Sequence, residues 1–187
     1  MGGTDNNQYF EVLDEQGHKT GKLVDRNEVH AKELWHEAIN VIIINSQGEA
    51  LVQLRGPNVD LAPNVWDVAI GTHLRPGEDP VAAAQRCLQG ELGLTITPEQ
   101  LQHLFNLQSA NQVEQGKLHK VLGHVFLLKR DLNIADCVFD TSRVAKLVWK
   151  PLLEVMAEVG STESASQYFP RAGQYYPLLL EALQGEM

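Results

Sequence analysis

The stretch that decides the fold reads GTHLRPGEDPVAAAQRCLQGELGL and runs from Gly71 to Leu94. Asp79 and Pro80 indicate the start of a helix within it, because aspartate suits the positive end of a helix and proline suits the first turn. Three later positions of that helix are spaced i, i+3 and i+4, so they face the same way. In chain order these positions hold Cys87, Gly90 and Glu91.

The segments on either side are strands and helices in irregular alternation. A run rich in β-branched residues predicts a buried strand at 38–45, and a turn joins it to a second strand at 49–55 as a hairpin. Further strands are predicted at 65–70, 103–110, 120–129 and 146–150, and further helices at 152–159 and 175–184. This pattern predicts an α/β fold in which helices cover both faces of a mixed β-sheet, an α/β/α sandwich.

A chain of 187 residues is long enough for one well-buried core and short for two. We therefore expect a single domain over residues 1–187, with its core at about 36–158. An N-terminal hairpin at 9–26 and a closing helix at about 174–184 complete it. The aliphatic surface expected on the closing helix would suit a homodimer.

The charge balance limits the classes of partner. The chain has 15 Lys+Arg and 24 Asp+Glu, a net charge of −9, which argues against nucleic acid and against a membrane surface. A small anionic substrate remains compatible, because a bound cation can reverse the sign of a site locally. Two distant cysteines form no disulfide framework and the first residues do not resemble a signal peptide, so we expect a cytoplasmic protein.

The spacing within the opening stretch resembles the box of the Nudix superfamily, G-x5-E-x7-R-E-U-x-E-E-x-G-U, where U is a bulky aliphatic residue. The chain matches this pattern without a gap at Glu78, Arg86, Leu88, Glu91, Gly93 and Leu94. It departs from the pattern at Thr72, Cys87 and Gly90. The resemblance implies the Nudix fold, with Glu78, Arg86 and Gly93 as structural residues of the box.

Carboxylates on the box helix explain the chemistry that this resemblance implies. Oxygen ligands there hold Mg²⁺ or Mn²⁺, which offsets the charge of a diphosphate and lowers the pKa of the attacking water. Glu91 is the expected catalytic carboxylate and metal ligand, with Glu78 as a second ligand. Cys87 is a poor ligand for Mg²⁺ and is expected to be a buried thiol, and Gly90 offers no side chain.

From Val12 to Trp149 the chain resembles the isopentenyl-diphosphate isomerase-like branch of this superfamily, including its variant box R-C-x-x-x-E-L-G. The resemblance implies a second metal, held by histidines. His30, His36 and His73 lie at or near the matching positions, and His119 is a candidate for a fourth ligand. Converging imidazoles suit a transition metal, whereas buried histidines that bond the backbone are the alternative.

Three functions remain open on the sequence alone. The first is a metal-dependent hydrolase acting on a small diphosphate-containing substrate. The second is the isomerase, although Gly71 stands where the resemblance places its cysteine and the strand at 118–128 lacks the expected glutamates. The third is an inactive protein that binds a diphosphate or a partner. The segment FPRAGQYYP at 169–177 is expected to be a plain surface connection, with closure over the substrate pocket as the alternative.

Overall fold

The fold is that of a computed structural model, which describes residues 9–59, 61–114, 117–171 and 173–184. In this part of the chain one seven-stranded sheet has the order β5-β4-β3-β8-β7, with β6 paired to β3 and β9 paired to β4. The strands are β3 (His36–Ile44), β4 (Glu49–Arg55), β5 (Trp66–Asp67), β6 (Ile70–His73), β7 (Leu101–Glu114), β8 (Lys117–Lys129) and β9 (Val144–Pro151). The sheet is mixed, because β3 and β8 are parallel whereas the other pairs are antiparallel.

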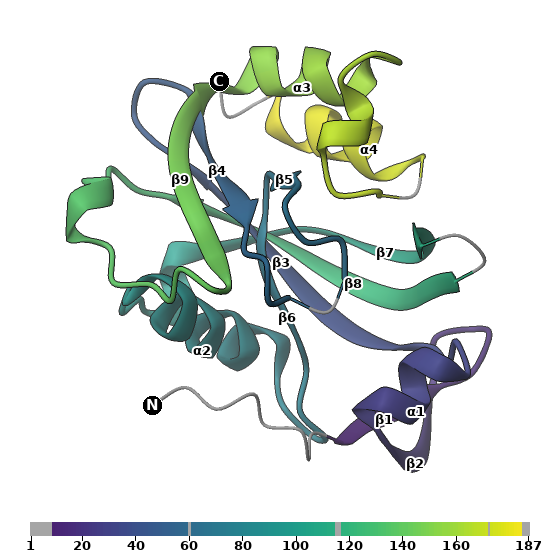
Figure 1. Ribbon diagram of the computed structural model, residues 1–187. Coiled ribbons are helices and arrows are strands. Elements are labelled where there is room, and N and C mark those ends of the chain that lie inside the picture. Colours follow the sequence, from purple (N-terminus) through teal and green to yellow (C-terminus); the bar gives the residue numbers. More distant parts are fainter. Residues whose placement is uncertain (1–8, 60, 115–116, 172, 185–187) are drawn as a thin grey trace.

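Helices lie on both sides of this sheet (Figure 1). Helix α2 (Pro80–Leu92) packs on one face, and α3 (Leu152–Gly160) and α4 (Tyr175–Leu183) pack on the other. Three short 3₁₀ turns, η1 (Pro98–Gln100), η2 (Ile134–Asp136) and η3 (Ala165–Gln167), connect the elements. The predicted α/β/α sandwich is therefore confirmed.

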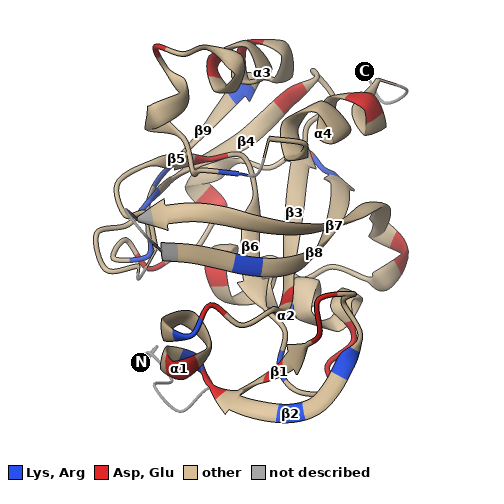
Figure 2. Cartoon of the chain, turned by 90° about the vertical axis from the view of Figure 1, so that its right-hand side faces the viewer, with Lys and Arg blue, Asp and Glu red and all other residues tan. Residues whose placement is uncertain are grey.

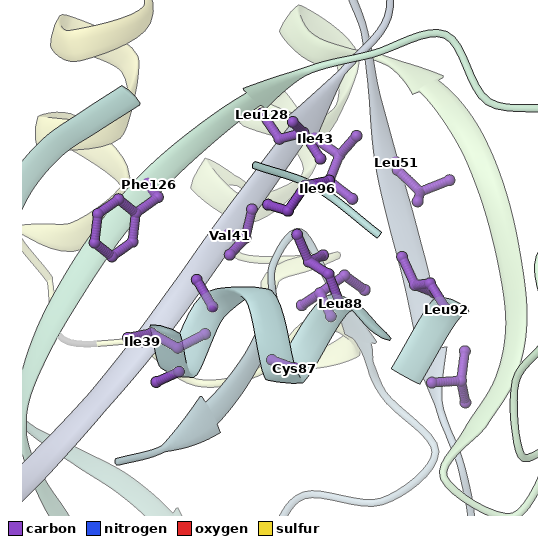
Figure 3. Packing of buried hydrophobic residues seen from close by; sticks show 14 of the residues in the cluster. Ile39, Val41, Ile43, Leu51, Cys87, Leu88, Leu92, Ile96, Phe126 and Leu128 are labelled. Carbon is purple, nitrogen blue, oxygen red and sulfur yellow. The ribbon is translucent and has the colours of Figure 1, made fainter. Parts of the chain in front are cut away.

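The central strand β3 builds both halves of the core, because successive side chains of a strand point to opposite faces. Ile39, Val41 and Ile43 face α2, where they meet Cys87 and Leu88 of the helix (Figure 3). Ile42 and Ile44 belong to the cluster under α3 and α4. A strand buried on both faces reads as the continuous aliphatic run seen in the sequence.

The ends of α2 follow from local sequence. The Asp79 side chain accepts hydrogen bonds from the amides of Val81 and Ala82, at 2.8 and 3.3 Å, and Pro80 occupies the first turn. Gly93 ends the helix at φ +70°, a left-handed conformation that glycine adopts without steric cost. The helix is thus fixed in register at both ends.

An N-terminal unit lies below the sheet in Figure 1. Strands β1 (Tyr9–Leu13) and β2 (Lys19–Asp25) form an antiparallel hairpin, and the short helix α1 (Arg26–Ala31) follows directly. Asp25 caps that helix by accepting from the amide of Asn27 at 2.9 Å. The sequence analysis did not predict α1, which carries His30 toward the sheet.

The structure bears on two expectations about the C-terminal part of the chain, the surface connection at 169–177 and the aliphatic surface of the closing helix. The segment at 169–177 is no plain surface connection, because Phe169 is buried and Arg171 packs deep against the sheet. The aliphatic side of α4 packs inward through Leu179 and Leu183, so it offers no obvious dimer surface. The homodimer and the single-domain boundaries stay predictions.

The surface carries both signs of charge. On the face in Figure 2, basic and acidic residues among the described ones are interspersed over several elements. Within the described ranges, no helix is long and apolar enough to cross a membrane.

Candidate functional site

A cavity of about 200 Å³ opens between the sheet, the end of α2 and the C-terminal segment. Its lining includes Glu91 from the box helix and, at another side, His73 and His119. Arginines dominate its charge: among the described residues the lining holds Arg26, Arg55, Arg143 and Arg171 against the carboxylates of Asp67 and Glu91. Such an excess of guanidinium groups suits an anionic ligand, because each offers a planar fork of donors.

The box loop is closed by an ion pair. Arg86 donates from Nε and Nη2 to the two carboxylate oxygens of Glu78, at 2.7 and 2.8 Å, and from Nη2 to the carbonyl of His73 at 3.0 Å. The amide of Arg75 also donates to Glu78, at 2.8 Å. Both oxygens of Glu78 are therefore engaged, and the pair ties α2 to the loop that follows β6.

Glu91 is also ion-paired, and its partner is Arg143. The Nε and Nη2 atoms of Arg143 donate to Oε1 of Glu91 at 3.0 and 2.9 Å. Burial works against the charge on Arg143, but the carboxylate outweighs it and raises the pKa of the guanidinium. The one carboxylate that the box helix brings to the cavity is therefore held by a cation of this chain.

The residues around Glu91 fit a box metal poorly. Cys87 is 3% exposed and packs in the core, and burial raises the pKa of its thiol, so it stays neutral. Gly90 supplies no ligand. A hard cation needs several oxygen ligands, and this helix offers one. That Glu91 and Glu78 bind Mg²⁺ or Mn²⁺ stays a prediction.

The four histidines singled out in the sequence meet at one point. His30 comes from α1, His36 from β3, His73 from β6 and His119 from β8, and their ligand atoms all lie within 4.8 Å of one another. Strand register brings them together, since His73 pairs with Ala38 across β3 and β6 and His36 pairs with Val121 across β3 and β8. Phe10 of the hairpin stacks on the His36 ring, with 5.2 Å between centroids.

This cluster fits a divalent transition metal. Burial lowers the pKa of His36 to about 4, that of His119 to about 2 and that of His73 well below its ordinary value. The rings of His36, His73 and His119 are therefore neutral at neutral pH, which is the form that binds metals. Among the described residues, Nε2 of His36 is buried without a hydrogen-bond partner, and a metal in the cluster would supply one.

The C-terminal segment supplies a wall of the cavity through Phe169 and Arg171, where the sequence analysis preferred a plain surface connection. Arg171 donates from Nη2 to both oxygens of Asp67, at 2.6 and 2.9 Å, and from Nη1 to Oδ1 of Asn40 at 3.0 Å. The Phe169 ring lies 4.9 Å from the guanidinium carbon of Arg55 and 5.0 Å from that of Arg171. Cation–π contacts of this kind fix both arginines at the cavity.

Gly71 bears on the isomerase alternative. It lies on β6 opposite Asn40, and a Cβ atom built on it would come within 2.7 Å of the carbonyl oxygen of Ile39. A side chain at this position would require the backbone to shift. The strand geometry here thus suits glycine and leaves no room for a cysteine.

Comparison with known proteins gives the family. The model of the NUDIX domain matches residues 34–172. The chain belongs to the NUDIX family. It is 33% identical to Nudix hydrolase 3 of Arabidopsis thaliana over 111 residues, and these residues are 59% of this chain and 14% of that protein.

A second curated relative is an isopentenyl-diphosphate Delta-isomerase of Pectobacterium atrosepticum. It is 33% identical over 117 residues, which cover 62% of this chain and 62% of that protein. The chain thus spans less than two thirds of both curated relatives. This Nudix chain is thus similar both to a relative named as a hydrolase and to one named as an isomerase.

Among solved structures, a crystal structure from Deinococcus radiodurans has a TM-score of 0.69 at 17% identity. It covers 92% of this chain and 98% of that one. At this identity the likeness shows the Nudix fold alone.

Proposed function

We propose that this Nudix protein is a metal-dependent hydrolase of a small diphosphate-containing substrate. The observation that carries the proposal is the cavity, whose lining combines arginines from four parts of the chain with Glu91 and with two histidines of the cluster. A diphosphate carries the negative charge that such a lining would bind. The family match supports the reaction class.

The arginines would bind and orient the diphosphate. Arg55 is fixed by donating to the carbonyls of Leu61 and Ala62 at 2.8 and 3.0 Å, and Arg171 is fixed by Asp67. Fixed donors bind a phosphate with little loss of side-chain freedom, since their geometry is set beforehand.

His30, His36, His73 and His119 would hold the metal. A divalent metal there would supply positive charge to the phosphoryl oxygens and lower the pKa of a bound water. His73 and His119 line the cavity, so the cluster adjoins the space in which the substrate would lie. The Mg²⁺ or Mn²⁺ that the sequence predicts at Glu91 stays an expectation outside this proposal, because α2 brings a single carboxylate to the cavity.

The isomerase is not the function that the geometry supports. Its reaction moves a proton, which requires an acid and a base beside the substrate carbon. Gly71 offers no thiol, and a side chain there would clash with the backbone of Ile39. A protein that binds a diphosphate without turnover is the remaining alternative.

Phosphate release tests the proposal. Metal-stripped protein is assayed with a panel of nucleoside and isoprenoid diphosphates, alone and after addition of Mg²⁺, Mn²⁺ or Zn²⁺. We expect release that requires a metal and that Glu91→Gln reduces at least tenfold, with the exposed Glu99→Gln as the matched control. No release above background from any combination contradicts the hydrolase, and binding without release supports the third alternative.

A further inference from the structure

We propose that Arg143 supplies the positive charge that binds the diphosphate beside Glu91, so that this half of the site works without a metal ion. The inference rests on the proposed function, because it assumes a diphosphate ligand. It replaces the expectation that Glu91 holds Mg²⁺ or Mn²⁺. Glu91 becomes a positioning residue for Arg143.

The first argument is the contact between the two side chains. Arg143 uses Nε and Nη2 on the same oxygen of Glu91, at 3.0 and 2.9 Å. This leaves the outer edge of the guanidinium group free for a second anion, and among the described residues no side chain or carbonyl accepts from its Nη1 atom. The Arg143 side chain is 46% exposed while that of Glu91 is 18% exposed, so the guanidinium lies on the open side of the pair.

The second argument is the backbone that carries Arg143. The carbonyl of Arg143 accepts from the amide of Gly56 at 2.7 Å, and the carbonyl of Ser142 accepts from the amide of Asn58 at 3.1 Å. A Cβ atom on Gly56 would come within 2.1 Å of the Ser142 carbonyl oxygen, so the close approach of these two segments requires glycine. Arg143 is thereby anchored next to the strand end that carries Arg55.

A turn fixes the other side of the same segment. The Asp140 side chain accepts from the amide of Ser142 at 2.8 Å, and its carbonyl accepts from the amides of Arg143 and Val144, both at 2.9 Å. Val144 then begins β9 and is buried. Arg143 thus lies in a hydrogen-bonded turn directly before β9. An arginine held in this way loses less conformational freedom on binding than one on a mobile surface loop.

The third argument is charge. Glu91 and Arg143 neutralise each other, so a metal ion arriving at Glu91 would meet a guanidinium group already in place and too few oxygen ligands around it. An arriving diphosphate meets the opposite situation, because the lining has more arginines than carboxylates. The loss of carboxylates at Cys87 and Gly90 and the presence of Arg143 then form one consistent change from metal to arginine.

The test is binding of methylenediphosphonate, a diphosphate analogue that resists hydrolysis, measured by calorimetry in EDTA and again with excess Mg²⁺. Mg²⁺ prefers oxygen ligands, so it leaves the histidine cluster empty and reports on the box. We expect wild type to bind equally in both buffers. We expect Arg143→Gln to bind tenfold to a hundredfold more weakly in EDTA, the range for a hydrogen bond between charged groups.

Added Mg²⁺ distinguishes the roles of the two side chains. Arg143→Gln releases Glu91, so Mg²⁺ should restore part of the binding to that variant and none to Glu91→Gln/Arg143→Gln. Arg143→Lys should bind at an intermediate level, because it keeps the charge and loses the fork. Arg130→Gln, which removes an arginine outside the cavity lining, is the control and should match wild type.

The outcomes separate this inference from the function on which it rests. Wild-type binding that needs Mg²⁺, or Arg143→Gln binding as tightly as wild type in EDTA, overturns the role of Arg143 and leaves the diphosphate site standing. No binding to wild type in either buffer overturns the diphosphate ligand itself. Thermal unfolding of each variant checks that it folds. If Arg143→Gln does not fold, the comparison of Arg143→Lys with wild type tests the same role.

Discussion

Nε2 of His73 lies 3.0 Å from Nε2 of His119, although the two residues are 46 positions apart in the chain. One ring comes from β6 and the other from β8, and the strand between them, β3, contributes His36. Two neutral imidazoles at this distance share at most one proton between the facing atoms. The pair can keep that proton as a hydrogen bond, or lose it when both facing atoms bind a metal.

The first prediction concerns metal binding by this cluster. Wild type should retain about one equivalent of Zn²⁺ or Co²⁺ after dialysis, because nitrogen ligands suit these ions. His73→Asn and His119→Asn should each weaken binding by more than the roughly 10- to 100-fold that a second-shell change costs. Metal content and the visible spectrum of the Co²⁺ form measure this.

The matched control is His18→Asn, since the His18 side chain is 78% exposed and lies in the turn between β1 and β2, outside the cluster. It should keep the metal. Equal metal content in wild type and both cluster variants would show that the histidines are only packed core residues.

The second prediction concerns the buried pair of Arg171 and Asp67, whose side chains are 8% and 4% exposed. Arg171→Leu leaves the buried Asp67 carboxylate with the more distant Arg55, at 3.9 Å, and should lower the free energy of unfolding by about 3 kcal/mol. Adding Asp67→Asn to that variant should recover part of the loss. Urea denaturation of the two single variants and the double variant measures the coupling, and additive losses would argue against a direct pair.

The third prediction concerns Gly71. Gly71→Ala places a Cβ atom within 2.7 Å of the Ile39 carbonyl oxygen and should destabilise the fold by about 1–3 kcal/mol. Gly71→Cys should cost at least as much and should not create isomerase activity. Gly90→Ala is the control, because a Cβ atom there meets nothing within 4 Å and alanine favours the helix. A Gly71→Ala protein as stable as wild type would show that a side chain fits at this position, and would remove this argument against the isomerase.

Strand register explains why part of the site was predictable. The box keeps its spacing along one continuous helix and loop, so the resemblance could assign Glu78 and Arg86 as its structural residues. The resemblance located the histidines, although the helix that carries His30 was not predicted. The continuous aliphatic run of β3 is equally readable, because a strand buried on both faces is apolar at successive positions.

The arginines could not be found in this way. Arg55 and Arg143 are 88 positions apart, and neither belongs to the box. They meet at the cavity because β4 and β9 pair side by side. Arg171 reaches the cavity only because the backbone of Phe169 bonds to Trp66, with its amide donating to the carbonyl at 2.7 Å. Long-range pairing of this kind leaves no local pattern in the sequence. Arg171 alone carried a signal for the cavity, because it is an arginine within an aromatic segment.

The fourth prediction concerns the contact that holds this segment in place. Glu158 of α3 accepts from Lys150 of β9 at 2.8 and 2.9 Å and from the hydroxyl of Tyr168. These bonds from Lys150 and Tyr168 lower the pKa of Glu158 below its ordinary 4.5. Glu158→Gln should therefore lower the free energy of unfolding by about 1 kcal/mol at pH 7.

The sign of the pH dependence follows from linkage. A carboxyl group with a lowered pKa in the folded state stabilises above its unfolded pKa, and this stability is lost as the pH falls through the folded value. The gap between wild type and Glu158→Gln should thus close below about pH 4.5, the ordinary value for this group. Denaturation curves at several pH values measure the gap, and a gap that widens on acidification contradicts the account.

The central claim is that a metal at the histidine cluster and the arginine-lined cavity together hydrolyse a diphosphate. The most direct measurement is phosphate release by metal-stripped wild type as Zn²⁺ or Mn²⁺ is titrated in, with His73→Asn beside it. We predict no release without metal, release that rises to saturation near one equivalent, and little release from His73→Asn. Release that is independent of metal, or equal in His73→Asn, would contradict the claim.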